Sequence, residues 1–144
     1  MKNKDLRKHT GVVCILRRPS GEMLMQFRAP DDKKFPNTWV FPGGGREGDE
    51  KYISTAIREM EEEFEIKLKE PDCELITIYT VQDLVEDNHV FVCKVAQDQN
   101  PVMHEGVDMK WMEMEEIESL SLGYKQSEVV LPKLKEFLLK RGEL

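Results

Sequence analysis

The chain has 144 residues and a formal net charge of −7, with 28 acidic residues against 21 basic ones. This length fits a single domain, and a hydrophobic content of 40% supplies a packed core and excludes a disordered chain. The acidic balance argues against a surface that follows the nucleic-acid backbone, so a nucleic-acid partner is not expected.

The sequence carries no recognisable signal for export or membrane insertion. The first ten residues, MKNKDLRKHT, lack the apolar run of a signal peptide, and no stretch approaches the ~20 apolar residues of a membrane span. Cys14, Cys73 and Cys93 are widely spaced and follow no metal-binding or disulfide pattern. We therefore expect a cytoplasmic protein without a membrane partner, whose cysteines are buried free thiols.

The first part of the chain predicts a β-hairpin followed by a glycine-rich loop. Apolar runs at 11–16 and 23–27 flank a segment with Pro19 and Gly21, which is typical of two strands and a turn. Residues 29–38 form a polar loop with two prolines, and 39–41 is a short strand candidate. The glycines at 43–45 then allow the backbone to approach a phosphate or a metal, although an ordinary turn would have the same sequence.

The middle of the chain carries the strongest helical pattern. Five apolar residues recur there at spacings of three and four, which predicts an amphipathic helix: Ile53, Ala56, Ile57, Met60 and Phe64. Further strands are expected at 74–81, 89–96 and 110–112, and a closing helix at 131–139. This order of elements predicts a mixed sheet covered by helices.

Three glutamates share one face of the central helix. Glu59, Glu62 and Glu63 stand at positions where like charges repel by roughly 0.2–0.5 kcal/mol per pair. A hard cation such as Mg²⁺ prefers oxygen ligands and would turn this repulsion into binding. Arg58 is adjacent and could fix one carboxylate by a forked hydrogen bond. The alternative for an acidic face of this kind is plain solvated surface.

The segment 44–66 joins these features in one motif, GGREGDEKYISTAIREMEEEFEI. It resembles the Nudix box, G-x5-E-x7-R-E-U-x-E-E-x-G-U, in which U is a bulky aliphatic residue. The matching positions are Gly44, Glu50, Arg58, Glu59, Met60, Glu62, Glu63 and Ile66. Glu65 departs from the box, whose glycine there ends the helix in a left-handed conformation. We expect this departure to cost ~1 kcal/mol in stability and to leave the chemistry intact.

The resemblance implies an α/β/α sandwich with a mixed β-sheet, in which the box forms a loop-helix-loop. It covers one domain over 1–144, with its core at roughly 8–140. The implied reaction is Mg²⁺-dependent hydrolysis of a nucleoside diphosphate linked to another group, with Mn²⁺ as the alternative ion. The leading hypothesis is a (d)NTP cleaved to the monophosphate and pyrophosphate. A nucleotide sugar, a dinucleotide or an RNA 5′ end remains an alternative substrate, and a non-catalytic nucleotide-sensing module is the alternative function.

The same resemblance implies the roles of individual residues at the centre of the site. The metal ligands would be the Gly44 carbonyl and the carboxylates of Glu59, Glu62, Glu63 and Glu105. Glu105 belongs to a segment, 104–112, that is similar to a downstream segment of the family. The proton of the attacking water would be taken by Glu59, oriented by Arg58, or by Glu105. Glu50 would support the loop or Arg58.

Three further residues are implied for substrate binding. Arg28 would bind a phosphate, although a solvated arginine at a strand end is the alternative. Asn88, in an expected loop at 85–89, would contact the base, although a turn residue is the alternative. Gln126 stands where MutT-type members carry an asparagine that selects an oxidised guanine, so that preference is not expected here. A homodimer is compatible with the sequence.

Overall fold

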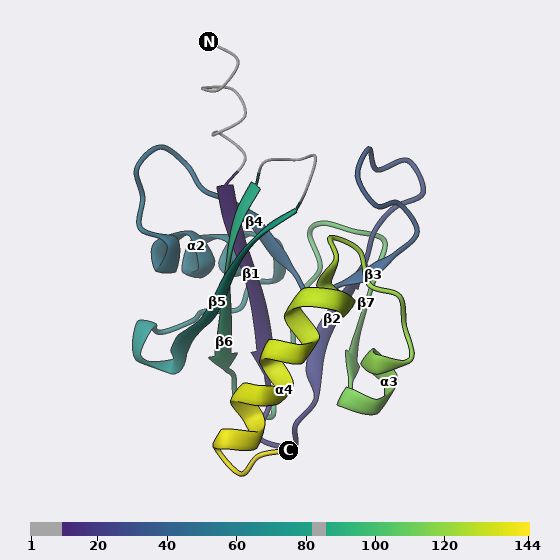
Figure 1. Cartoon of the computed structure of the whole chain (residues 1–144). Coiled ribbons are helices and arrows are strands. Elements are labelled where there is room, and N and C mark those ends of the chain that lie inside the picture. Colours follow the sequence, from purple (N-terminus) through teal and green to yellow (C-terminus); the bar gives the residue numbers. More distant parts are fainter. Residues whose placement is uncertain (1–9, 82–85) are drawn as a thin grey trace.

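A mixed β-sheet with helices on both faces forms the protein in this computed structural model, which describes residues 10–81 and 86–144 (Figure 1). The strand order is β3 (Trp39–Val40), β2 (Met23–Phe27), β1 (Thr10–Arg17), β6 (Glu86–Lys94) and β5 (Cys73–Val81). The short β4 (Gly43–Gly45) pairs with β1, and β7 (Asp108–Met112) pairs with β2. The β1–β6 pair is parallel, whereas β1–β2 and β5–β6 are antiparallel.

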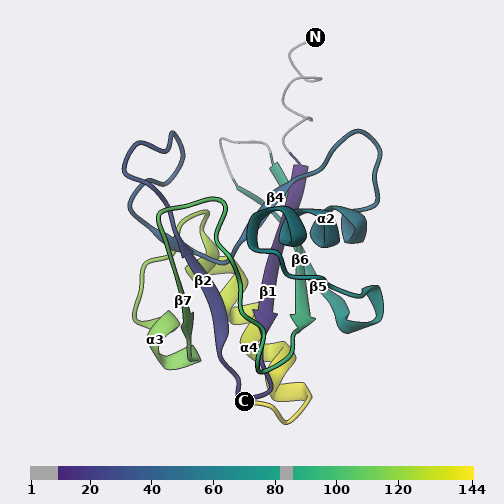
Figure 2. The ribbon, with the colours of Figure 1, turned by 180° about the vertical axis from the view of Figure 1, so that it is seen from behind.

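The helices lie on opposite faces of this sheet. They are α2 (Tyr52–Phe64), α3 (Met114–Glu118) and α4 (Leu131–Lys140), with a 3-10 turn at Glu70–Asp72 and a π-helical turn at Gln126–Val130. Figure 1 shows α4 in front of the strands, and the reverse view in Figure 2 shows α2 on the other side. In the described part of the chain, no helix is long and apolar enough to cross a membrane.

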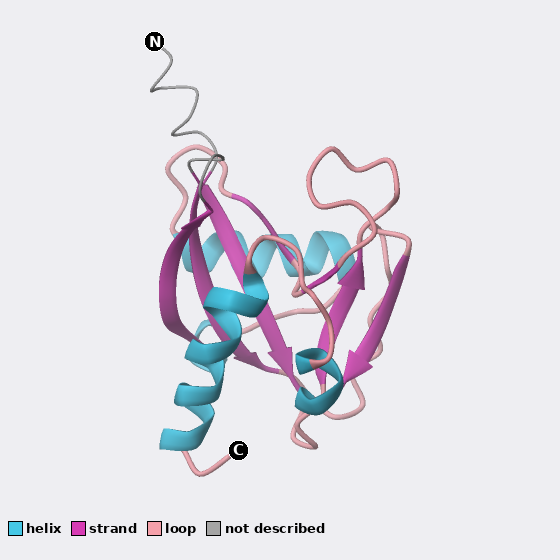
Figure 3. Ribbon diagram, turned by 45° about the vertical axis from the view of Figure 1, so that its right-hand side comes forward, coloured by secondary structure: helices cyan, strands magenta, loops and turns pink. Residues whose placement is uncertain are grey.

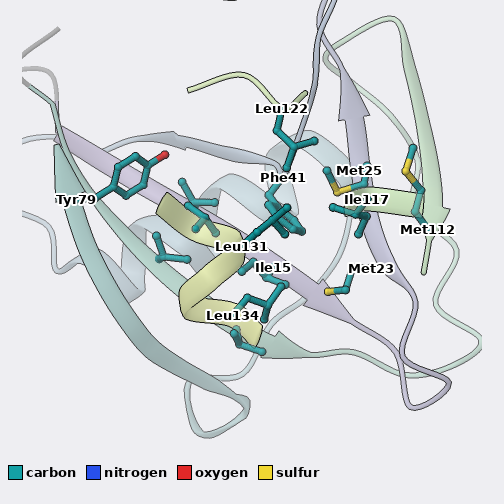
Figure 4. Packing of buried hydrophobic residues seen from close by; sticks show 14 of the residues in the cluster. Ile15, Met23, Met25, Phe41, Tyr79, Met112, Ile117, Leu122, Leu131 and Leu134 are labelled. Carbon is teal, nitrogen blue, oxygen red and sulfur yellow. The ribbon is translucent and has the colours of Figure 1, made fainter. Parts of the chain in front are cut away.

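The central strand β1 supplies both halves of the core. Successive side chains of a strand point to opposite faces of the sheet. Val13 and Ile15 are accordingly buried with Leu134 of α4, and Figure 4 shows Ile15 beside that helix. Cys14 is buried on the other face with Met60 of α2. The structure therefore confirms the expected α/β/α sandwich.

The sheet opens between β1 and β2. These strands are paired only at Arg17 and Met23, and Figure 3 shows them leaning apart from that point. The chain after β3 enters the opening, where the Cys14 amide donates to the Pro42 carbonyl at 2.7 Å and Val12 lies opposite Gly44. The split is therefore not closed by a continuous ladder between β1 and β2, and both polar and apolar residues line it.

The predicted elements are confirmed in type, with several shifts in their limits. The early hairpin and the central helix form as expected. The strand predicted to begin at 89 begins at Glu86, so the loop expected at 85–89 is wrong for 86–89, and residue 85 lies outside the described residues. Parallel pairing with β1 extends this strand. The glycines at 43–45 form a strand although glycine has low β-propensity, because they pair with β1.

Candidate active site

A cavity of about 500 Å³ lies in the split between β1 and β2. Most of the site residues expected from the sequence line it, namely Arg28, Gly44, Glu59, Glu63, Asn88, Glu105 and Gln126. Arg58 and Glu62 are not among its lining residues. Side chains from β2, α2, β6 and two later loops therefore meet at one place, although they are spread over about a hundred positions of the sequence.

Gly44 brings the β4 backbone directly against α2. A methyl group on Gly44 would overlap the carboxylate of Glu59, and a methyl group on Gly11 of β1 would overlap the Gly44 carbonyl oxygen. Only glycine permits such close approach. The glycine strand thus holds the Glu59 carboxylate at the cavity wall.

Arg58 forms hydrogen bonds with several carboxylates on the outer side of α2. Its Nη2 donates to Glu50 Oε1 at 2.7 Å and to the Gly45 carbonyl at 2.9 Å. Its Nη1 donates to Glu59 Oε2 at 3.0 Å and to Glu62 Oε1 at 3.2 Å. One guanidinium therefore ties the loop before α2 to the helix and fixes one oxygen of Glu59.

The outer carboxylates are neutralised by this arginine. The hydrogen bond from Arg58 and the one from the Glu47 amide lower the pKa of Glu50 to about 2. The same contact with Glu50 raises the pKa of Arg58 above its usual value. Glu50 also accepts from the buried Thr55 hydroxyl at 2.9 Å, so its role in this structure is to brace the loop and Arg58.

The inner carboxylates have the opposite environment. Glu63 is 9% exposed, and burial together with the carboxylates of Glu59 and Glu105 raises its pKa to about 10. In the ranges that the structure describes, no Lys, Arg or His forms an ion pair with Glu63 or Glu105. This side of α2 therefore concentrates negative charge that the described protein does not neutralise.

The inner set fits a hard divalent cation by its chemistry. Carboxylate and carbonyl oxygens are the ligands that Mg²⁺ prefers, and a cation would remove the repulsion at Glu63. Within residues 10–81 and 86–144, no three His, Cys, Asp or Glu side chains already stand as a complete metal site. Glu62 is not brought to the inner set, because its side chain is 59% exposed and rests on Arg58.

The segment that carries Glu105 is fastened to the end of α2. The amides of Val102 and His104 donate to the carbonyls of Phe64 and Glu63 at 2.9 and 2.8 Å. Gln26 of β2 donates to the Glu105 carbonyl at 2.8 Å from the other side. These bonds place the Glu105 carboxylate near Glu63.

Arg28 is fixed at the opposite wall by contacts of its own. Its Nε donates to the Lys34 carbonyl at 2.8 Å, and its Nη2 lies 3.8 Å from Asp32 Oδ2. The guanidinium stands 5.2 Å from the centre of the Tyr124 ring. Arg28 is the one Lys or Arg among the described residues that line the cavity, where it faces four acidic side chains, Asp32, Glu59, Glu63 and Glu105.

Asn88 and Gln126 provide buried amides at the cavity. Asn88 is 9% exposed, and its Nδ2 is buried without a hydrogen-bond partner among the residues that the structure describes. Gln126 is 2% exposed, and its Oε1 accepts from the Phe41 amide at 2.8 Å. Gln126 begins the π-helical turn, after Tyr124 and Lys125 in left-handed conformations with φ of 56° and 55°. Turns of this kind are frequent at functional sites.

The sequence analysis missed Gln26, Asp32 and Tyr124, which also line the cavity. Gln26 carried a usable signal, since it is the polar residue in an otherwise apolar strand, MLMQF, and is 7% exposed. Asp32 and Tyr124 lie in loops whose paths follow no periodic pattern, so their sequence positions gave no comparable signal.

Comparison with known proteins defines the class to which this fold and site belong. The family model described as NUDIX domain matches residues 7–134. The chain therefore belongs to the NUDIX family, as the spacing in the segment 44–66 predicted.

Individual relatives show how far the similarity extends along the chain. The Danio rerio m7GpppN-mRNA hydrolase NUDT17 is 40% identical over 62 residues, 43% of this chain and 20% of that protein. The Mus musculus diphosphoinositol polyphosphate phosphohydrolase 2 is 26% identical over 116 residues, 78% of this chain and 62% of that protein. The chain thus spans less than two thirds of either relative. A MutT structure from work on Aliivibrio salmonicida and Vibrio cholerae has a TM-score of 0.73 at 20% identity, covering 89% of this chain and 98% of that one, and shows the shared fold.

Proposed function

We propose that this protein is a divalent-cation-dependent pyrophosphohydrolase whose substrate is a nucleoside diphosphate linked to another group. The leading substrate is a nucleoside triphosphate, cleaved to the monophosphate and pyrophosphate. One observation carries the proposal. Glu59, Glu63 and Glu105 line the same cavity, and neither Glu63 nor Glu105 has a cationic partner among the described residues. Membership of the NUDIX family supports the same reaction.

The inner carboxylates are the residues that would hold the cation. In this proposal Glu59, Glu63 and Glu105 supply carboxylate oxygens and Gly44 supplies its carbonyl, while Glu62 joins them only by leaving Arg58. A bound Mg²⁺ or Mn²⁺ supplies charge neutralisation of the pyrophosphate and a more acidic water. Because the raised pKa of Glu63 reports uncompensated charge, the folded site favours a species that brings positive charge.

Two carboxylates can accept the proton of the attacking water. Glu59 is held by Arg58 at 3.0 Å, which keeps one oxygen fixed and leaves the other at the Gly44 side of the cavity. Glu105 is carried by the segment fastened to α2. Substitution of each by glutamine separates them, since the acceptor is the residue whose loss removes the water-activation limb of the pH–rate profile.

Arg28 is the residue assigned to the phosphate chain. Its contacts with the Lys34 carbonyl and Asp32 restrain the guanidinium at the cavity wall, where it can donate to phosphate oxygens. A single arginine against four acidic lining residues suits one phosphate chain with a cation. It does not suit a ring that carries many phosphates, so we do not transfer the substrate of the diphosphoinositol relative to this chain.

Product analysis on the purified protein with Mg²⁺ tests the proposal. The panel would contain the nucleoside triphosphates, ADP-ribose, a nucleotide sugar, a dinucleoside polyphosphate and an RNA with a 5′ triphosphate. Reaction in ¹⁸O-labelled water would show which phosphorus is attacked. Monophosphate plus pyrophosphate from a triphosphate is the expected result, and turnover of another panel member would replace the leading substrate.

A matched pair of variants makes this assay specific for the site. Glu63→Gln removes one inner carboxylate, whereas Glu61→Gln makes the same change at an exposed position two residues away on the same helix. Activity should disappear in the first variant and persist in the second. Nucleotide binding by the wild-type protein without any turnover would instead support the non-catalytic sensing module.

A further inference from the structure

Gln26 is a buried amide in a strand of apolar residues. It belongs to the β2 sequence MLMQF, is 7% exposed and lines the cavity. Its Nε2 group donates to the Glu105 carbonyl at 2.8 Å. Burying an amide is unfavourable unless it is hydrogen-bonded, so this bond compensates for the presence of a polar residue at this position.

The Glu105 carbonyl lies where the backbone has the most freedom. The next residue is Gly106, whose φ of 90° belongs to the region that glycine adopts readily. The hydrogen bonds to α2 end at the His104 amide, and the Val107 amide donates to the Phe27 carbonyl of β2 at 3.2 Å. The peptide unit between Glu105 and Gly106 therefore lies between two fixed points. Because both ends are held, the orientation of this peptide unit and the direction of the Glu105 side chain are linked.

Gln26 also restrains this peptide unit by close packing. A methyl group on Gly106 would lie 2.8 Å from the Nε2 atom of Gln26 and 3.0 Å from its Cγ atom. The side chain thus lies directly against the glycine while its amide holds the preceding carbonyl. One residue of β2 therefore fixes the position and the orientation of the turn that carries Glu105.

The same strand leads to the arginine assigned to the phosphate chain. Arg28 stands two residues after Gln26, so the two side chains point to the same side of the strand, and both line the cavity. The bond from Gln26 thus sets the place of Glu105 relative to Arg28. A fixed separation between a cation ligand and a phosphate ligand suits a phosphate chain that is bound through a cation.

We propose that Gln26 is a positioning residue, whose amide holds the Glu105 peptide so that the carboxylates of Glu105 and Glu63 meet at one divalent cation. This rests on the proposed function in requiring that a cation bind at the inner carboxylates. Loss of a group that orients a metal ligand typically weakens metal binding by about tenfold to a hundredfold. We therefore expect the loss of the Gln26 donor to weaken cation binding by about tenfold.

Binding of Mn²⁺ alone tests this role without depending on turnover. Gln26→Met keeps the length of the side chain and removes its N–H donor, whereas Gln26→Asn keeps the amide but is one methylene too short to reach the carbonyl. Electron paramagnetic resonance of the free ion would measure the affinity of each metal-free protein for Mn²⁺. Both variants should bind the ion about tenfold more weakly than the wild type, and melting curves of the metal-free proteins would show that each is folded.

A double-mutant cycle separates positioning of Glu105 from a general loosening of the cavity. Glu105→Gln alone should weaken Mn²⁺ binding. Adding Gln26→Met to Glu105→Gln should weaken it by no more than about twofold further, because the residue that Gln26 positions has already lost its charge. A purely structural role for Gln26 would give losses that multiply.

Gln97 offers a matched control. Its side chain also restrains a loop, since its Oε1 accepts from the Ser20 amide at 2.9 Å, but it is exposed and does not line the cavity. Gln97→Met removes a bond of the same kind and should leave the affinity for Mn²⁺ unchanged.

The outcomes distinguish this inference from the proposed function. Unchanged Mn²⁺ affinity in both folded Gln26 variants, losses that multiply in the cycle, or Glu105→Gln without effect on Mn²⁺ binding would overturn the positioning role, and turnover by the wild type would still support the proposed reaction. Mn²⁺ binding that depends on Gln26 through Glu105, without hydrolysis of any nucleotide in the panel, would overturn the proposed reaction and support the positioning role. Failure of the wild type to bind Mn²⁺ would overturn both.

Discussion

The two sides of α2 carry the same residue type in opposite electrostatic states. On the outer side, Arg58 contacts Glu50 and Glu62, and the pKa of Glu50 falls to about 2. On the inner side, Glu63 faces carboxylates, and its pKa rises to about 10. The difference separates carboxylates that contact Arg58 from carboxylates without a described cationic partner, and both groups lie on α2, on the loop directly before it or on the 104–106 segment beside it.

The largest expected effect is on the inner side. Glu63→Gln should lower kcat/KM by at least about a hundredfold, because it removes the buried carboxylate that we propose as a metal ligand. Glu62→Gln should cause a smaller loss, since that carboxylate is exposed and rests on Arg58. Steady-state kinetics with Mg²⁺ titrations on both variants would measure the difference. An equal or greater loss in Glu62→Gln would place Glu62 among the metal ligands and break the comparison.

The next effect concerns the arginine that divides the two sides. Arg58→Lys keeps the charge but loses the fork that contacts Glu50, Glu59 and the Gly45 carbonyl together. We expect the free energy of unfolding to fall by about 1–3 kcal/mol, with about a tenfold loss of kcat as Glu59 becomes less fixed. Chemical denaturation and kinetics would measure both. Arg141→Lys, at an exposed ion pair with Glu74, is the control and should change neither.

The pH dependence of stability should also differ between the two sides in the metal-free protein. Because folding raises the pKa of Glu63, protonated Glu63 favours the folded state, and this contribution is fully present below about pH 4.5. It is lost as the pH rises toward about 10 and the carboxyl group ionises. Glu50 has the opposite dependence, because folding lowers its pKa. Its ionised form stabilises the folded state above about pH 4.5, and this contribution is lost as the pH falls toward about 2.

Thermal melts in EDTA between pH 5 and 9 isolate the inner side. The wild-type melting temperature should fall across this window, and Glu63→Gln should fall less because it cannot ionise there. Added Mg²⁺ should restore the wild-type value at high pH, since a ligand of the folded state stabilises it. Parallel slopes for the two proteins would show that Glu63 is not the group responsible.

The central helix and the spacing of its glutamates could be predicted from the sequence, because both depend on local helical periodicity. The stripe that includes Ala56, Met60 and Phe64 is buried as predicted, and the spacing of Glu59 and Glu63 places both at the cavity. In this structure Glu62 contacts Arg58 and does not line the cavity, so its assignment as a metal ligand stays a prediction. Periodicity gives the face of a helix, whereas the position of Arg58 decides which carboxylate it captures.

Contacts between strands that are far apart in the sequence could not be predicted from local sequence patterns. Cys73 lies opposite Cys93 across β5 and β6, and the Cys93 thiol also contacts Cys14. The sequence spacing of these cysteines suggested no association, and Cys73 is only half-buried rather than buried. The same applies to Gln26 and Glu105, which meet through the pairing of β2 with β7.

The smallest expected effect is at Glu65, where the chain departs from the Nudix box. Glu65 occupies the left-handed position at the end of α2, with φ 55° and ψ 34°, as the box predicts for its glycine. Its carboxylate lies 2.5 Å from His104 Nε2, beside Glu105. Left-handed geometry costs a non-glycine residue roughly 1–2 kcal/mol, whereas an exposed ion pair contributes about 0–1 kcal/mol.

Glu65→Gly should therefore keep or raise the melting temperature and leave activity within about twofold. Glu65→Ala is the informative partner, because it loses the contact with His104 and keeps the strained backbone, so its melting temperature should fall. Activity lost equally in both variants would mean that the Glu65–His104 contact positions Glu105 in the site. Because α2 already binds this segment through the carbonyls of Glu63 and Phe64, we expect the backbone contacts to be sufficient.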